Sequence, residues 1–136
     1  MKSLLNTDKK TILLVDDEEK MGVFFLTLLK WKGYNVVNAS NGQEAVDAYK
    51  LNPDSIDLIL MDISMPVMSG IEAYRELKQY DPTVPIILMS GYTSNTFEGF
   101  THTQFIQKPM KLTDLFTAIE KVLEDSAARS QSVEKD

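Results

Sequence analysis

The sequence of 136 residues contains no cysteine, a single histidine, and no apolar run long enough to cross a membrane. Without cysteine, the chain has no disulfides, thiolate nucleophiles or cysteine zinc sites. A membrane helix needs about 20 apolar residues. The first ten residues also lack the apolar stretch of a secretory signal. We therefore expect a protein of the cytoplasm with no membrane contact.

Basic residues are also few, since 14 Lys and Arg stand against 20 Asp and Glu and give a formal net charge of −6. A negative chain has no overall field that attracts DNA, RNA or anionic lipid. We therefore expect no direct binding to nucleic acid. With 43% hydrophobic residues, the length suffices for one domain with one core and leaves too little for a second.

Short apolar runs alternate with longer amphipathic segments along the chain. The runs Ile12–Val15, Leu58–Met61 and Ile86–Met89 are too short for stable helices and lack polar alternation. This pattern is typical of parallel strands that are covered on both faces. Weaker strands are predicted at 34–37 and 104–107. Five strands alternating with five helices indicate an α/β fold, a doubly wound parallel sheet with helices on both faces.

The segments between these runs predict the helices. Gly33 ends the first helix, and Asn41 with Glu44 resembles a capping box before the second. The predicted helices cover 19–32, a segment that starts after Asn41, 71–80, a short piece within 94–100, and 112–124. The buried stripe of the first helix is predicted as Met21, Phe24, Phe25, Leu28 and Leu29. We expect residues 1–10 to be an N-terminal extension, 11–125 the domain, and 126–136 a disordered tail or linker stub.

Polar side chains follow four of the apolar runs at the point where each run ends. Asp16 and Asp17 follow the run that ends at Val15, Asp62 follows Met61, and Ser90 follows Met89. Lys108 follows the weaker strand predicted at 104–107. Because the carboxyl ends of parallel strands meet at one sheet edge, where ligands bind in such folds, we expect these groups to converge. Crowded carboxylates need a proton or a cation. A site of oxygen ligands suits a hard cation such as Mg²⁺, or Mn²⁺.

Each of these residues also has a simpler interpretation. A single aspartate often caps a helix or a turn, and Lys108 could be a plain ion-pair partner of Asp17 or Asp62. The complete set at strand ends favours chemistry on a phosphoryl group instead. Asp62 would act as nucleophile, while Lys108, Ser90 and a metal ion would contact the phosphoryl oxygens.

Together these motifs resemble the receiver domain of two-component response regulators over about Thr11 to Asp125. They are V-D-D-E at 15–18, L-M-D-I-S-M-P-V-M-S-G at 60–70, M-S-G at 89–91 and F-I-Q-K-P at 105–109. The resemblance implies a flavodoxin-like sheet of strand order 2-1-3-4-5. It also implies a phosphoacceptor switch of a phosphorelay that regulates a partner and is not a turnover enzyme. A stand-alone receiver and one from a hybrid sensor histidine kinase both fit.

The resemblance assigns a role to each site residue. Asp62 is the phosphoacceptor; Asp16, Asp17, Asp62 and the Ser64 carbonyl hold the metal; Ser90 and Lys108 contact the phosphoryl group; Ser90 and Phe105 form the switch; Ser64 and Tyr92 tune hydrolysis. The implied donor is a phosphohistidine on a sensor histidine kinase or a histidine phosphotransfer domain. The implied target is an output protein or a fused domain.

One departure from the family pattern lies between Ser90 and Lys108, which are 18 positions apart (108 − 90). This is shorter than usual by about one helical turn, so the fourth helix is expected to be short. The resemblance therefore does not decide which face of this chain carries the output. Other classes fit less well. An aspartate-nucleophile phosphatase would carry a D-x-D pair and a cap domain, and a flavin module would need a glycine-rich phosphate loop where residues 16–19 are all acidic. A pseudo-receiver that only binds partners would lack this complete set.

Overall fold

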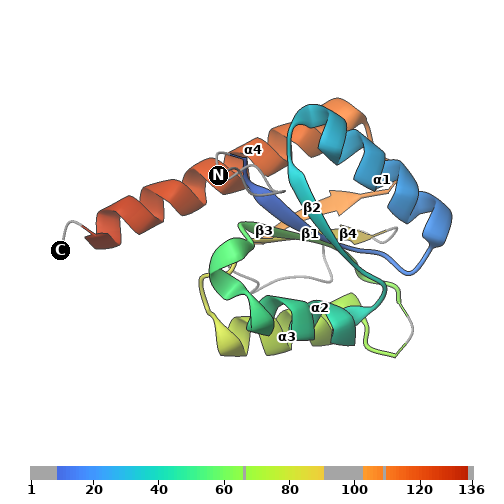
Figure 1. Ribbon diagram of the computed structural model, residues 1–136, viewed down its shortest axis with the longest axis horizontal. Coiled ribbons are helices and arrows are strands. Elements are labelled where there is room, and N and C mark those ends of the chain that lie inside the picture. Colours follow the sequence, from blue (N-terminus) through green and yellow to red (C-terminus); the bar gives the residue numbers. More distant parts are fainter. Residues whose placement is uncertain (1–8, 66, 91–102, 109, 135–136) are drawn as a thin grey trace, which may run out of the picture.

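A computed structural model describes residues 9–65, 67–90, 103–108 and 110–134. Within them, five strands and four α-helices form a sheet with helices on both sides (Figure 1). The elements are β1 (Thr11–Val15), α1 (Glu19–Lys32), β2 (Asn35–Ala39), α2 (Gly42–Leu51), a 3₁₀ turn (Pro53–Ser55), β3 (Leu58–Asp62), α3 (Gly70–Tyr80), β4 (Ile86–Ser90), β5 (Thr103–Gln107) and α4 (Leu112–Glu134). All strand pairs are parallel, in the order β2-β1-β3-β4-β5. This confirms the predicted flavodoxin-like order.

Alternate residues of the strands enter two separate cores, one on each face of the sheet. The first core joins β1, β3 and β4 to α2 and α3 through Leu13, Val15, Ile59, Met61, Ile86, Leu88, Tyr49, Tyr74 and Leu77. The second joins them to α1 and α4 through Ile12, Leu14, Leu58, Leu60, Ile87, Met89, Phe25, Leu29, Leu115 and Ile119. Because both faces are covered (Figure 1), the central strands are apolar from Ile12, Leu58 and Ile86 up to the site residues.

The second strand begins one residue later than the sequence pattern predicts, because the Tyr34 amide is hydrogen-bonded to the last turn of α1. Gly33 has a φ of 109°, in the left-handed region, and the Tyr34 amide donates to the Leu29 carbonyl at 3.0 Å. The strand then continues to Ala39, whose carbonyl accepts the Asp16 amide at 3.2 Å. The extended β2 therefore helps to position the first acidic residue of the site.

Two sequence predictions about the helices were wrong. The fourth helix of the structure, α4, continues to Glu134, so 126–134 is not a disordered tail. This segment contains no glycine or proline, and its alanines support a helix; Figure 1 shows α4 extending beyond the sheet. Phe24 is not buried but 47% exposed. The predicted helix within 94–100 lies outside the described residues.

A buried tyrosine links the two helices that cover the first core. The Tyr49 hydroxyl donates to Asp81 Oδ2 at 2.7 Å, and Asp81 Oδ1 accepts the amide and the hydroxyl of Thr83. Burial raises the pKa of Tyr49, and the hydrogen bond to Asp81 raises it further. Burial also acts to raise the pKa of Asp81, but the hydrogen bonds from Tyr49 and Thr83 outweigh it and the pKa falls below 3.8.

We expect Tyr49→Phe to lower the free energy of unfolding by about 1–3 kcal/mol at neutral pH, because a hydrogen bond to a charged acceptor is lost. A lowered carboxyl pKa stabilises the fold above the unfolded value and loses this effect as the pH falls through the folded value. The difference between variant and parent should therefore shrink below about pH 4. Urea unfolding at several pH values measures it. Tyr80→Phe is the control, since Tyr80 is half-exposed and no hydrogen bond of its hydroxyl is described; an equal loss there would contradict the prediction.

Candidate functional site

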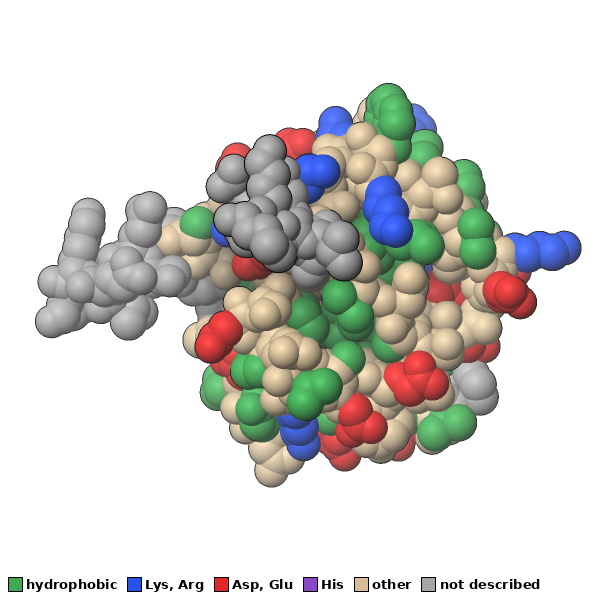
Figure 2. Space-filling view, in the orientation of Figure 1, with side chains coloured by type: hydrophobic (Ala, Val, Ile, Leu, Met, Phe, Trp, Pro, Cys, Tyr) green, Lys and Arg blue, Asp and Glu red, His purple; other side chains and the backbone are tan. Residues whose placement is uncertain are grey.

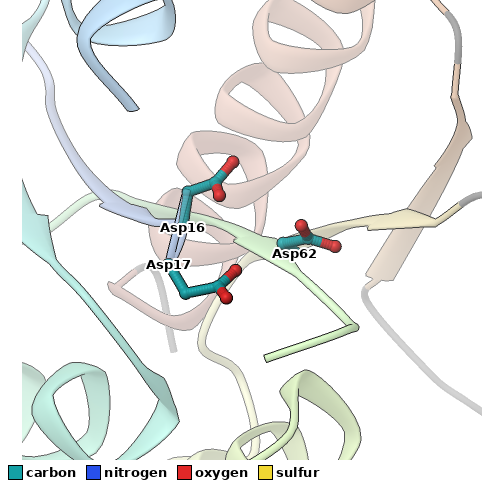
Figure 3. A group of neighbouring side chains, drawn as sticks. All are labelled: Asp16, Asp17 and Asp62. Atoms are coloured by element: carbon teal, nitrogen blue, oxygen red, sulfur yellow. The ribbon is translucent and has the colours of Figure 1, made fainter. Parts of the chain in front are cut away.

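Three carboxylates meet where β1 and β3 end. Asp16 and Asp17 follow β1 directly, and Asp62 is the last residue of β3, which is paired with β1. One oxygen from each lies within 4.8 Å of the other two, and Figure 3 shows the side chains gathered at this edge. The predicted convergence of these aspartates is therefore found in the structure.

Asp16 has one satisfied and one unsatisfied carboxylate oxygen. Its Oδ1 accepts the Glu18 amide at 2.9 Å, whereas Oδ2 is buried and has no hydrogen-bond partner among the described residues. Burial raises the pKa of Asp16, the Glu18 hydrogen bond lowers it, and the charge of Asp62 raises it again. A buried carboxylate oxygen without a donor is costly unless a cation approaches it.

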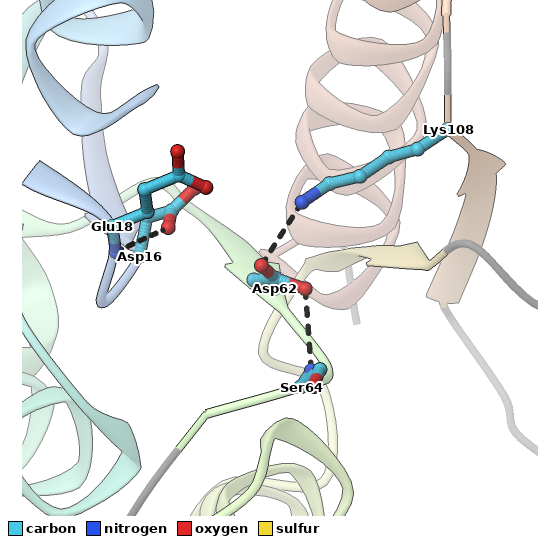
Figure 4. Close-up of polar contacts among 5 residues, drawn as sticks. All are labelled: Asp16, Glu18, Asp62, Ser64 and Lys108. Carbon is cyan, nitrogen blue, oxygen red and sulfur yellow. Dashed lines mark hydrogen bonds and ion pairs between the residues drawn. The ribbon is translucent and has the colours of Figure 1, made fainter. Parts of the chain in front are cut away.

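Asp62 is fixed by a partner on each oxygen (Figure 4). The Lys108 ammonium lies 2.9 Å from Oδ2, and the Ser64 amide donates to Oδ1 at 3.2 Å. The Asp62 side chain is 11% exposed and that of Lys108 is 30% exposed. The carboxylate is therefore held at the rim of the sheet, where a small reactant can still reach it.

The end of β4 brings Ser90 beside this pair. Ser90 is buried and its carbonyl accepts the Lys108 amide at 2.8 Å, which continues the β4–β5 ladder by one residue. Phe105 lies in β5 opposite Leu88 and is half-buried against the first core. Tyr92 lies outside the described residues, so the role predicted for it is untested.

Close packing behind Asp62 is a feature that the sequence analysis missed. The Gly70 amide donates to the Ile63 carbonyl at 2.8 Å, and a Cβ on Gly70 would lie 2.5 Å from the Asp62 carbonyl oxygen and 2.7 Å from the Ile63 Cα. Helix α3 begins with a capping box between Ser69 and Glu72, which fixes this contact. The S-x-x-E spacing is a signal for the start of α3, although not for the contact with Asp62.

Val67 adds backbone strain to the same connection. Its φ is +67°, a value that β-branched residues rarely adopt, and its side chain is 80% exposed. The next residue, Met68, accepts the Gly42 amide through its carbonyl at 3.2 Å. A residue in this conformation costs of order 1–3 kcal/mol, so the surrounding contacts fix the chain between Asp62 and α3.

The donor set fits a hard divalent cation. Each of the three aspartates offers a carboxylate oxygen, and the Asp16 Oδ2 atom has no protein donor in the described part of the chain. Cysteine is absent from the sequence. Oxygen ligands of this kind bind Mg²⁺ or Mn²⁺ in preference to softer metals.

The family model for the response regulator receiver domain matches residues 12–120. The chain belongs to this family. The match begins at the second residue of β1 and includes the other four strands and every residue of the candidate site. Receiver domains are signalling modules of two-component systems.

A sensor kinase, a chemotaxis protein and a response regulator protein are similar to this chain. Autoinducer 1 sensor kinase/phosphatase LuxN of Vibrio campbellii is 40% identical over 87 residues, which cover 64% of this chain and 10% of LuxN. Chemotaxis protein CheY of Thermotoga maritima is 37% identical over 119 residues, 83% of this chain and 97% of CheY. The crystal structure of response regulator protein TrrA from Thermotoga maritima, in complex with Mg²⁺-BeF, has a TM-score of 0.73 at 29% identity and covers 83% of this chain and 98% of TrrA.

The receiver thus spans about a tenth of the sensor kinase that it matches and nearly the full length of CheY. Among the described residues, none of the helices is sufficiently long and apolar for a membrane span.

Proposed function

We propose that this receiver accepts a phosphoryl group on Asp62 and thereby acts as a switch in a two-component phosphorelay. The observation that carries the proposal is the position of the Asp62 carboxylate, held by Lys108 and lying beside Asp16 and Asp17 at the sheet edge. Isolated aspartate caps would not need a lysine and two further carboxylates around them. Phosphoryl transfer needs this kind of alignment and charge neutralisation.

In the proposed reaction, an Asp62 oxygen attacks the phosphorus of a phosphohistidine and forms a P–O bond. The P–N bond breaks, its electron pair stays on the imidazole, and that ring takes up a proton. The Lys108 backbone is held by its hydrogen bond to Ser90, while its side chain is free to turn. The ammonium can therefore move from the Asp62 carboxylate to a phosphoryl oxygen. The Ser90 hydroxyl is the proposed donor to a second oxygen.

Asp16, Asp17 and Asp62, with the Ser64 carbonyl, are the proposed ligands of Mg²⁺ or Mn²⁺. The cation would neutralise the crowded carboxylates and the negative charge of the phosphoryl group. The unpartnered Asp16 Oδ2 supports this assignment. Because an anion would otherwise be repelled by three carboxylates, we infer that phosphorylation depends on the metal.

Incubation with acetyl phosphate and Mg²⁺, followed by intact-mass measurement, tests the proposal. We expect a single phosphoryl adduct that neutral hydroxylamine removes, as it removes an acyl phosphate. In this assay the P–O bond to acetate breaks and acetate leaves with the electron pair. Absence of the adduct would contradict the proposal. Continuous release of phosphate from a phosphomonoester would instead indicate a turnover phosphatase.

We expect Asp17→Asn to weaken Mg²⁺ binding at least about tenfold, because a charged ligand is replaced by a neutral one. The fold should be retained, since Asp17 is exposed, and crowding of like charges is reduced. Titration of Mg²⁺ by isothermal calorimetry measures the affinity. Glu19→Gln, an exposed acid in the first turn of α1, makes the same charge change outside the cluster. Equal losses in the two variants would mean that only the overall charge matters.

The proposed donor is a sensor histidine kinase or a histidine phosphotransfer domain, and the proposed site of action is the cytoplasm. Similarity to both a sensor kinase and CheY supports either a receiver joined to a kinase or a stand-alone one. Rearrangement of Ser90 and Phe105 is the proposed output step. Ser64 and Tyr92 are the residues proposed to tune hydrolysis, and faster loss of phosphate in Tyr92→Ala would support this for Tyr92.

A further inference from the structure

A pocket of about 440 Å³ lies between α1 and the start of α4, next to the proposed phosphorylation site. Five of its six lining side chains are apolar and one is cationic; they are Met21, Phe24, Phe25, Met110, Leu112 and Lys108. Small-molecule pockets commonly measure about 300–1,000 Å³ and combine apolar walls with a few polar groups. The size and lining therefore suit a compact organic ligand.

The walls of the pocket favour an aromatic ligand. Phe24 and Phe25 lie edge to face, with ring centroids 5.6 Å apart and planes at 63°. Phe25 is buried whereas Phe24 is 47% exposed, and an inserted ring could pack against Phe24 in offset or edge geometry. Met21 and Met110 are unbranched and adapt to ligands of different outline. Figure 2 shows exposed hydrophobic side chains over α1.

Lys108 gives the pocket its charge. The ammonium has three N–H donors. One of them donates to Asp62 Oδ2, with Nζ and Oδ2 2.9 Å apart. The structure describes no second acceptor for this ammonium, and the side chain remains partly exposed. A ligand with an anionic group would therefore find both a positive charge and available donors at one side of the pocket. The nearby carboxylates oppose such an anion less when a divalent cation neutralises them.

We propose that this pocket binds a small molecule with an aromatic body and one anionic group. The bound anion would compete with the phosphoryl group at Asp62 for the Lys108 ammonium. The first part stands on the pocket alone. The second part rests on the proposed function, because it assigns the same ammonium to the phosphoryl group. Ligand and phosphoryl group would then weaken each other's binding reciprocally.

Two fluorescent probes test the binding, both with Mg²⁺ in excess. One is 8-anilinonaphthalene-1-sulfonate, and the other is N-phenyl-1-naphthylamine, which has the same aromatic body without the sulfonate. We expect saturable one-to-one binding of the sulfonate, about fivefold tighter than that of the neutral probe if the ion pair contributes as a partly exposed pair does. Lys108→Met should remove this preference. Phe24→Ser should weaken both probes about tenfold through lost apolar contact.

Trp31→Ser is the matched control, because Trp31 is also in α1 and 79% exposed but does not line the pocket. Unchanged probe affinity in this variant supports the pocket; a loss equal to that of Phe24→Ser would overturn it. Equal affinities of the two probes for the parent would overturn the anionic preference. Probe binding that falls as protein concentration rises would assign the surface to a second copy of the chain and also overturn the proposal.

The coupling is tested by adding the sulfonate probe to the acetyl phosphate reaction. We expect the initial rate of Asp62 phosphorylation to fall with probe occupancy in the parent and to be little affected in Phe24→Ser at the same probe concentration. Tight probe binding with an unchanged rate would overturn the competition for Lys108. Failure of phosphorylation without probe would contradict the proposed function, and the binding measurements would still decide the pocket.

Discussion

Replacement of Asp62 by asparagine is expected to abolish the phosphoryl adduct entirely. The amide is a poor nucleophile toward phosphorus, and the change removes one of the three carboxylates of the proposed metal site. The variant would also lose the charge that holds the Lys108 ammonium 2.9 Å from Asp62 Oδ2. Intact mass after incubation with acetyl phosphate and Mg²⁺ measures the effect, and circular dichroism confirms that the variant is folded.

Asp54→Asn is the control for this prediction. Asp54 is exposed in the 3₁₀ turn, so the variant has the same change of net charge away from the site. It should be phosphorylated as the parent is. A phosphoryl adduct in Asp62→Asn that maps to another carboxylate would contradict the assignment of Asp62. An adduct on a serine or threonine would resist neutral hydroxylamine and is thus distinguishable.

Gly70→Ala is expected to destabilise the fold by about 1–3 kcal/mol or more and to slow phosphorylation. The new Cβ would lie 2.5 Å from the Asp62 carbonyl oxygen and 3.1 Å from the Asp62 carbonyl carbon. These are backbone atoms that cannot rotate away, so either α3 or the end of β3 must shift, which is the cost of overpacking. Displacement of Asp62 from Lys108 would then reduce the rate, since catalytic alignment is sensitive to shifts of about 1 Å.

Gly22→Ala makes the same chemical change inside α1, where a Cβ would meet nothing within 4 Å. This variant should gain about 0.5–1 kcal/mol, because alanine is the better helix former. Urea unfolding and the initial rate of adduct formation give both readouts. Equal stability of Gly70→Ala and Gly22→Ala would show that the contact behind Asp62 is not rigid.

The convergence of Asp16, Asp17, Asp62, Ser90 and Lys108 was predictable because it follows from topology. Once the apolar runs are taken as parallel strands, their carboxyl ends must lie at one edge of the sheet. The same reasoning gave the central strands to within one residue at each end. The apolar pattern of a strand and the residues that follow it depend on the local sequence. They can therefore be recognised before the tertiary contacts are known.

The exposure of Phe24 could not be read from α1 alone. Helical spacing places Phe24 near the buried Phe25, but the covering of each side chain depends on where α4 and the β5–α4 connection lie. The end of α4 differs from the prediction for a related reason. The polar composition around Ser126 predicts disorder, but a segment without glycine or proline can continue a helix that is already nucleated. The contact of Gly70 with Asp62 is likewise a tertiary approach that spacing does not encode.

The place of Asp62 at the end of β3 has a consequence for motion. Strand β3 is paired with β1 on one side and β4 on the other, and its amides should exchange with deuterium only when the whole domain opens. The backbone that carries the carboxylate is therefore expected to move less than its surroundings when charge is added there. Any displacement must occur in side chains around it or toward β5, which has a single described neighbour. Hydrogen exchange that changes on phosphorylation should therefore be concentrated on the β4–β5 side, with β3 acting as the fixed reference of the sheet.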